Sequence, residues 1–186
     1  MELMRKIWKV LLELAETLVI AGAIFVVVYA FLIRPFQVTG QSMHPTFQNG
    51  EYVFTNLLSQ RFGPLDRGDV IVFKAPPSED KDYIKRIIGV PGDQVKIEDG
   101  KVYLNGKLLQ EPYIAPDIRT DSRGFAQEGQ EISVSENSYF VMGDNRPFSS
   151  DSRDWGLVTF DKVIGKSALV YWPINRVRFV EHEDYK

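Results

Sequence analysis

The feature that most constrains this 186-residue chain is an apolar run at residues 14–33, in which Glu16 is the one charged residue. As a helix, this run would be about 30 Å long, which matches the hydrocarbon thickness of a bilayer. Basic residues precede the run and Arg34-Pro35 follows it. By the positive-inside rule, we predict a cytoplasmic tail at residues 1–13, a transmembrane helix at 14–33 and an extracytoplasmic domain at 34–186.

Two other interpretations of the apolar run are a cleaved secretory signal and the buried helix of a soluble protein. A secretory signal has an apolar core of about 7–15 residues followed by a small-residue cleavage site. This run is longer and ends in Arg34-Pro35-Phe36. The mean hydropathy of the whole chain is −0.17, so the rest of the chain must be water-soluble. These observations favour a retained anchor.

The composition excludes several functional classes. The formal net charge of −3 lacks the basic excess of proteins that bind nucleic acid. The chain has no Cys, which excludes disulfides, thiolate nucleophiles and zinc sites built on Cys. Its two His residues are too few for a zinc site built on three His.

The residues after the apolar run are predicted to form an all-β domain. Short runs rich in Val, Ile, Tyr and Phe are typical of strands, and they lie at 51–55, 69–73, 83–90, 93–98, 101–104, 138–142 and 163–172. Asp99-Gly100 and Asn105-Gly106 favour type I′ turns, so residues 93–110 should form two linked hairpins. The polar stretch at about 111–136 is expected to be an exposed loop or insert. We therefore predict a mostly antiparallel β-sheet with a hairpin extension.

A first candidate for chemistry is Ser42, which lies on a turn between Gly40 and Pro45 where a nucleophile can be presented. A plain turn serine explains the same pattern. His44 is only two residues from Ser42 and precedes Pro45, and His182 lies in a charged tail. Neither histidine is therefore well placed to act as the base of a Ser-His-Asp triad.

Lys85 is the candidate base. On a strand, Tyr83, Lys85 and Ile87 share one face while Arg86 points to the other. A free lysine has a pKa of about 10.4. It can act as a base near neutral pH only if burial lowers this pKa by roughly 2–3 units. The alternative is an edge lysine that reaches solvent and blocks aggregation between strands. A third cluster, residues 143–156, carries hydroxyls and alternating charges that suit an ordered loop, although a solvated loop explains them too.

Together these segments resemble the bacterial type I signal peptidases, which are membrane-bound Ser/Lys endopeptidases. The resemblance covers nearly the whole chain in order: the anchor, Ser42-Met43-His44-Pro45-Thr46, Gly68 to Phe73, Tyr83 to Asp93, Gly143-Asp144-Asn145-Arg146 and Ser149 to Arg153. It implies cleavage of N-terminal signal peptides from exported preproteins, after small residues of the Ala-x-Ala type. It implies an acyl-enzyme mechanism that needs no metal or other cofactor.

The resemblance also implies a role for particular residues. Ser42 is the nucleophile, whose main-chain N–H also donates to the oxyanion, and Lys85 is the general base. Some relatives carry a Ser as a second oxyanion donor where this chain has Gly40, so that donor is left open. The implied role of Ser149 is to position the lysine. Ion pairs Asp144–Arg86 and Asp151–Arg153 support the site, and the implied substrate pockets are lined by Phe36, Val38, Met43, Tyr83 and Ile84.

The expected partners are preprotein signal peptides, the lipid bilayer and a protein-secretion translocon, with no nucleic acid. The expected location is the plasma membrane, with the N-terminus in the cytoplasm, although the sequence does not distinguish this from a thylakoid membrane. Three other classes compete: a soluble Ser/Lys autoprotease of the repressor-cleaving kind, an anchored β-domain without enzymatic activity, and an organellar membrane peptidase. The apolar anchor argues against the first, and a tolerated Ser42→Ala substitution would mark the second.

Overall fold

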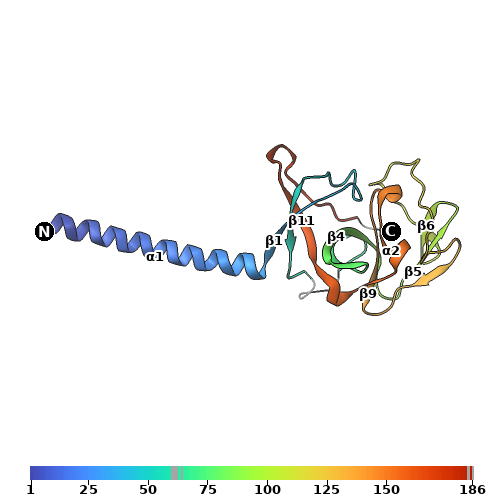
Figure 1. Ribbon diagram of the computed structural model, residues 1–186, viewed down its shortest axis with the longest axis horizontal. Coiled ribbons are helices and arrows are strands. Elements are labelled where there is room, and N and C mark those ends of the chain that lie inside the picture. The colour runs from blue at the N-terminus through green and yellow to red at the C-terminus, as the bar shows by residue number, and fades with distance from the viewer. Residues whose placement is uncertain (60–62, 64, 184, 186) are drawn as a thin grey trace.

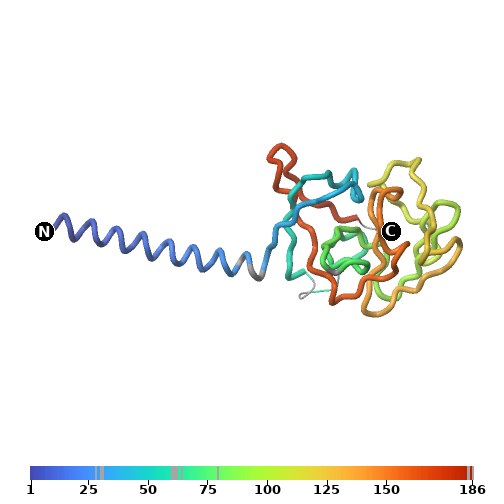
Figure 2. Tube along the Cα trace, viewed as in Figure 1, coloured from blue at the N-terminus to red at the C-terminus, as the bar shows by residue number. Residues whose placement is uncertain are grey.

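A computed structural model of the chain describes residues 1–59, 63, 65–183 and 185. A single long helix, α1 (Glu2–Phe31), extends away from a compact body of β-strands (Figure 1). Figure 2 traces the path of the chain from this helix into the body. The prediction of an N-terminal apolar helix followed by a mostly antiparallel β domain is therefore confirmed.

The helix differs from the expected element in its bounds. It begins at Glu2, twelve residues before the apolar run, because residues 3–13 alternate apolar and charged helix-forming side chains without a Pro or Gly. It ends at Phe31, since Pro35 disfavours helical backbone just before it. Its stretch Glu2–Val27 is long and apolar enough to cross a membrane, and the body covers none of its most apolar window.

The larger sheet holds the strands nearest to α1 and is antiparallel throughout. Its order is β1-β2-β11-β3-β4-β9-β10, with β12 paired to β11. The strands are β1 (Ile33–Gln37), β2 (Tyr52–Asn56), β3 (Val70–Ala75), β4 (Ser78–Gly89), β9 (Ser138–Met142), β10 (Val158–Thr159), β11 (Val163–Trp172) and β12 (Arg178–Phe179).

The second sheet is the expected hairpin extension, inserted between β4 and β9, which are neighbours in the first sheet. Its order is β7-β6-β5-β8, with β5 (Gln94–Glu98), β6 (Lys101–Leu104), β7 (Lys107–Leu108) and β8 (Glu131–Ser133). Asp99 and Asn105 have positive φ of 54° and 51°, and the glycine after each is also positive. The two Xaa-Gly pairs thus form the tight turns that the sequence predicted.

The stretch at about 111–136, expected to be an exposed loop or insert, is partly buried. It contains β8, and Thr120 and Ala126 are buried within it. The N–H groups of Phe125 and Ala126 both donate to the carbonyl of Arg153, at 2.8 and 3.0 Å. These backbone hydrogen bonds hold the stretch against the polar loop 143–156. In a solvated loop, the same N–H groups would donate to water instead.

Four short helices complete the fold: η1 (Arg146–Phe148), α2 (Ser152–Trp155), η2 (Phe160–Lys162) and η3 (Ile174–Arg176). Apolar side chains fill the body in three clusters, one under the second sheet and two on the faces of the first. The central strand β4 contributes to all three, and this places its polar residues deep in the body.

Candidate active site

The loop that carries Ser42 connects β1 to β2. Its ends are closed by hydrogen bonds from Val38 N–H to the Glu51 carbonyl and from Gly50 N–H to the Val38 carbonyl, both 2.8 Å. Met43 and Phe47 anchor the loop by packing into the core beneath it. Because its anchors point inward, the loop presents Ser42 on its outer side in a fixed position.

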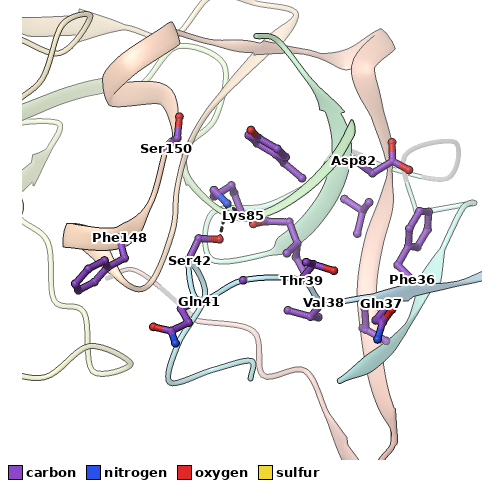
Figure 3. Close-up of a pocket in the computed structure, with 15 residues that line it drawn as sticks. Phe36, Gln37, Val38, Thr39, Gln41, Ser42, Asp82, Lys85, Phe148 and Ser150 are labelled. Atoms are coloured by element: carbon purple, nitrogen blue, oxygen red, sulfur yellow. Dashed lines mark hydrogen bonds between the residues drawn. The ribbon is translucent and has the colours of Figure 1, made fainter. Parts of the chain in front are cut away.

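Lys85 reaches this serine from β4, where it lies opposite Ile71 of β3. Its Nζ lies 2.8 Å from Ser42 Oγ and donates to the Ile84 carbonyl at 2.9 Å (Figure 3). Only 3% of Lys85 is exposed, so the alternative of an edge lysine that reaches solvent is wrong. The structure therefore brings together the two residues that the sequence left 43 positions apart.

Burial lowers the pKa of Lys85 from its ordinary value to about 8. Asp151 and Asp144 act in the opposite direction, since negative charge favours the ammonium form. Their effect is limited because each carboxylate is already paired with an arginine. A serine hydroxyl beside an amine with this pKa is the arrangement that activates a nucleophile.

The opposite face of β4 carries Arg86, which is buried together with Asp144. The guanidinium donates to both carboxylate oxygens, at 3.0 and 2.7 Å. Asp144 also accepts a hydrogen bond of 2.5 Å from Thr46 Oγ1, in the loop that carries Ser42. The Asp144 carboxylate therefore connects β4 to the loop that carries Ser42. The expected Asp144–Arg86 ion pair is present in the structure.

The loop 143–156 holds the nucleophile from the other side. Asn145 donates twice, from its N–H to the Ser42 carbonyl at 3.0 Å and from Nδ2 to the Gln41 carbonyl at 2.9 Å. A Cβ on Gly143 would lie 2.4 Å from the Ser42 carbonyl oxygen, so this close approach requires glycine. The sequence analysis did not single out Asn145 or Thr46, because an exposed amide or hydroxyl in a turn is too common to stand out.

The second expected ion pair also forms. Arg153 Nε lies 2.8 Å from Asp151 Oδ1, and both side chains are fully buried. Burial raises the pKa of the Asp151 carboxyl, but the hydrogen bonds from Arg153 and from the Gly143 N–H outweigh burial and lower this pKa overall. Asp151 also caps α2, so it fixes the whole loop.

Ser149 does not make the expected hydrogen bond to Lys85. Its hydroxyl is buried and meets no partner in hydrogen-bond geometry within the described part of the chain. It does help to lower the pKa of Asp151, so it lies on the side of that carboxylate. Lys85 makes its hydrogen bonds with Ser42 and with the Ile84 carbonyl of its own strand instead.

A cavity of about 320 Å³ opens beside the Ser42–Lys85 pair (Figure 3). Four of the five expected pocket residues line it: Phe36, Val38, Tyr83 and Ile84. Met43 was expected there but lies in the core, because the loop turns its side chain inward as an anchor. The sequence analysis missed other lining residues, among them Gln37, Thr39, Val53, Val72, Asp82, Phe148 and Ser150, because they come from distant segments.

Gly40 also lines the cavity, with a φ of +92° that suits glycine, and its N–H donates to Asn49 Oδ1 at 2.8 Å. A Cβ at this position would have open space. No cluster of three metal-ligating His, Asp or Glu side chains occurs among residues 1–59, 63, 65–183 and 185.

A buried lysine against a turn serine, at the mouth of a cavity in an antiparallel β fold, is an arrangement compatible with a serine hydrolase. Residues 11–172 match the family model described as signal peptidase, peptidase S26. The chain belongs to this family, and it is a serine endopeptidase.

Individual relatives agree with the family match. The chain is 41% identical over 175 residues to signal peptidase I S of Bacillus subtilis, which covers 91% of this chain and 94% of that protein. It is 33% identical over 182 residues to signal peptidase IB of Staphylococcus aureus, covering 92% and 94%. A crystal structure of a signal peptidase I from Enterococcus faecalis is 32% identical, with a TM-score of 0.47, and covers 56% of this chain and 97% of that one.

Proposed function

We propose that this protein removes N-terminal signal peptides from exported preproteins, with Ser42 as nucleophile and Lys85 as general base. The observation that carries the proposal is the 2.8 Å contact between Ser42 Oγ and the buried Lys85 Nζ, whose pKa is lowered to about 8. At neutral pH a useful fraction of this amine is unprotonated, and it can take the hydroxyl proton as Ser42 attacks the scissile carbonyl.

The reaction proceeds through an acyl-enzyme. The lysine passes the proton to the leaving amine, and water then hydrolyses the ester at Ser42. The main-chain N–H of Ser42 donates to the tetrahedral oxyanion, a contact worth about 3–4 kcal/mol where such a donor has been removed from other enzymes. Gly40 lies two residues before it and brings no hydroxyl, so the second donor is a main-chain group or a water molecule.

Small apolar residues, such as Ala at the first and third positions before the cut, suit the cavity. Phe36, Val38 and Ile84 give it apolar walls. An extended substrate would place alternate side chains on the same side, so the first and third would enter the cavity together.

Helix α1 is proposed to span the plasma membrane, with the β domain outside. Its apolar residues are exposed around the whole helix, and a helix of this kind needs lipid or protein to cover it. Residues 5–9 supply the positive charge that keeps this end in the cytoplasm. Ser42 follows the helix by eleven residues, so it stays within about 40 Å of the membrane, where signal peptides of translocated chains emerge.

Cleavage of a preprotein with Ala at the first and third positions before the cut tests this function. We expect the detergent-solubilised chain to cut at that one bond, and Ser42→Ala and Lys85→Met each to reduce kcat/KM by at least about a thousandfold. Lys96→Ala is the matched control, since Lys96 is a lysine of the second sheet whose partner is Glu98. Full activity in either dyad variant would rule out the proposed mechanism.

A further inference from the structure

Phe148 is an aromatic side chain at the rim of the catalytic cavity that the cleavage mechanism leaves without a role. It lines the cavity together with Ser42 and Lys85, yet 73% of it is exposed. Exposed aromatic residues at the edge of a binding groove are typical of contacts made only when a ligand arrives.

The turn that carries Phe148 is held rigidly. Phe148 N–H donates to the Asn145 carbonyl at 3.0 Å, and Asn145 itself holds the nucleophile loop. Arg153 donates to the Arg146 carbonyl at 2.7 Å, and Arg123 donates to the carbonyls of Arg146 and Pro147 at 3.2 Å. A well-fixed backbone thus presents one free apolar ring beside the serine, and little conformational entropy would be lost when a substrate binds it.

Phe148 and Phe36 line opposite ends of the same cavity, with Ser42 and Lys85 between them. In Figure 3, Phe148 and Gln41 lie on one side of the Ser42–Lys85 contact, whereas Phe36 and Asp82 lie on the other. An extended peptide across the serine must therefore pass Phe36 on one side of the scissile bond and Phe148 on the other.

The position of α1 determines which end of the cavity holds the residues before the cut and which end holds the residues after it. Phe36 belongs to β1, which begins two residues after α1 ends, whereas Phe148 precedes α2, farther from the helix (Figure 1). A signal peptide held in the same membrane as α1 would enter from the β1 end, so the residues before the cut occupy the cavity near Phe36. The residues after the cut, which begin the released protein, then reach Phe148.

We propose that Phe148 is a specificity-determining residue that contacts apolar side chains at the first two positions after the cut. This inference rests on the proposed function, and it adds a preference on the leaving side that the apolar walls at Phe36, Val38 and Ile84 do not supply. The occupant is the N-terminal end of the released protein, in an extended conformation.

The test compares two preproteins with Ala at the first and third positions before the cut. One has Leu-Leu immediately after the cut and the other has Gly-Gly. For the full-length chain in detergent, we expect Phe148→Ala to lower the ratio of kcat/KM for Leu-Leu to kcat/KM for Gly-Gly about five- to tenfold. Phe148→Leu, which keeps an apolar side chain, should restore most of this ratio.

Phe179→Ala is the matched control, because Phe179 is 80% exposed but lies on β12 and does not line the cavity. For Phe179→Ala, the ratio of kcat/KM for Leu-Leu to kcat/KM for Gly-Gly should equal that of the unaltered chain. An unchanged ratio in Phe148→Ala, or an equal fall in Phe179→Ala, would overturn the inference while leaving the peptidase function in place. If the unaltered chain cut neither preprotein, the proposed function itself would fail.

Discussion

At the scale of single residues, the site depends on one unfavourable burial. Lys85 has lost nearly all contact with water, and its pKa falls to about 8, whereas an unfolded lysine titrates near 10.5. This difference in pKa between the folded and the unfolded chain corresponds to about 3 kcal/mol in the free energy of unfolding at pH values below 8. This free energy opposes folding, and under the proposed mechanism the lowered pKa leaves the amine able to accept a proton from Ser42.

The first prediction concerns the pH dependence of cleavage. Because only the neutral amine can act as base, kcat/KM should rise about tenfold per pH unit below pH 8 and level off above it. Initial rates on a preprotein with Ala at both positions before the cut, taken from pH 6 to 10, measure the profile. A plateau that extends below pH 7 would show that Lys85 is not the titrating group.

The second prediction separates stability from activity at the same residue. Lys85→Met removes the buried amine but keeps an unbranched side chain, so we expect the free energy of unfolding to increase by about 1–3 kcal/mol at pH 7 while cleavage is lost. Between pH 8 and 10.5 the unfolded chain binds a proton that the folded chain does not, so the stability of the unaltered protein rises with pH. The advantage of the variant should therefore shrink across that window.

Denaturant unfolding at pH 7 and pH 10 measures both parts of this prediction. Ser42→Ala is the control, because it abolishes the nucleophile but leaves the lysine buried. A Lys85→Met chain that is less stable at pH 7 would contradict the claim that burial of this amine opposes folding.

At the scale of elements, β4 connects Lys85 to the buried ion pair behind it. Lys85 and Arg86 are adjacent and point to opposite faces, so the strand places the amine beside Ser42 on one face and the guanidinium beside Asp144 on the other. This alternation was predictable from the period of a strand. The loop 143–156 supplies the partners, and its ion pairs orient it against both β4 and the nucleophile loop.

A third prediction follows from the burial of the Arg86–Asp144 ion pair. Asp144→Ala would leave Arg86 charged and unpaired at a fully buried position, so we expect a loss of about 3–5 kcal/mol in the free energy of unfolding. Glu98→Ala removes the partner of Lys96 in a solvent-exposed pair, so its loss should be much smaller than that of Asp144→Ala. Urea unfolding of both variants tests the contrast, which equal losses would contradict.

Much of this arrangement could be predicted from the sequence, and the rest depends on tertiary contacts. Strands 138–142 and 163–172 were predicted with the correct bounds because their apolar runs end at clear turn residues. Strand β1 was missed, since Arg34 and Pro35 interrupt its pattern and pairing with β2 decides its conformation. The inward turn of Met43 and the position of Ser149 beside Asp151 likewise depend on how the loops pack, which no local pattern encodes.

At the scale of the whole molecule, α1 and the β domain are physically separate parts. The most apolar window of the helix contacts nothing in the body, and the catalytic contacts all lie after residue 40. Under the proposed function, the helix contributes by holding the enzyme at the membrane. Confining enzyme and substrate to one membrane raises their effective concentration without any new contact at the site.

The last prediction tests this division. A chain without residues 2–31 keeps β1 and the whole β domain, so we expect its melting temperature to stay within a few degrees of that of the full chain. It should cleave a short soluble peptide with kcat/KM within about threefold of the full chain in detergent, because the groove and the dyad are intact. For a preprotein embedded in vesicles, however, it should be slower by about a hundredfold or more, since the shared membrane no longer concentrates the two partners. Equal rates on the vesicle substrate would mean that the β domain finds the membrane by itself, whereas loss of the soluble activity would mean that α1 supports the site directly.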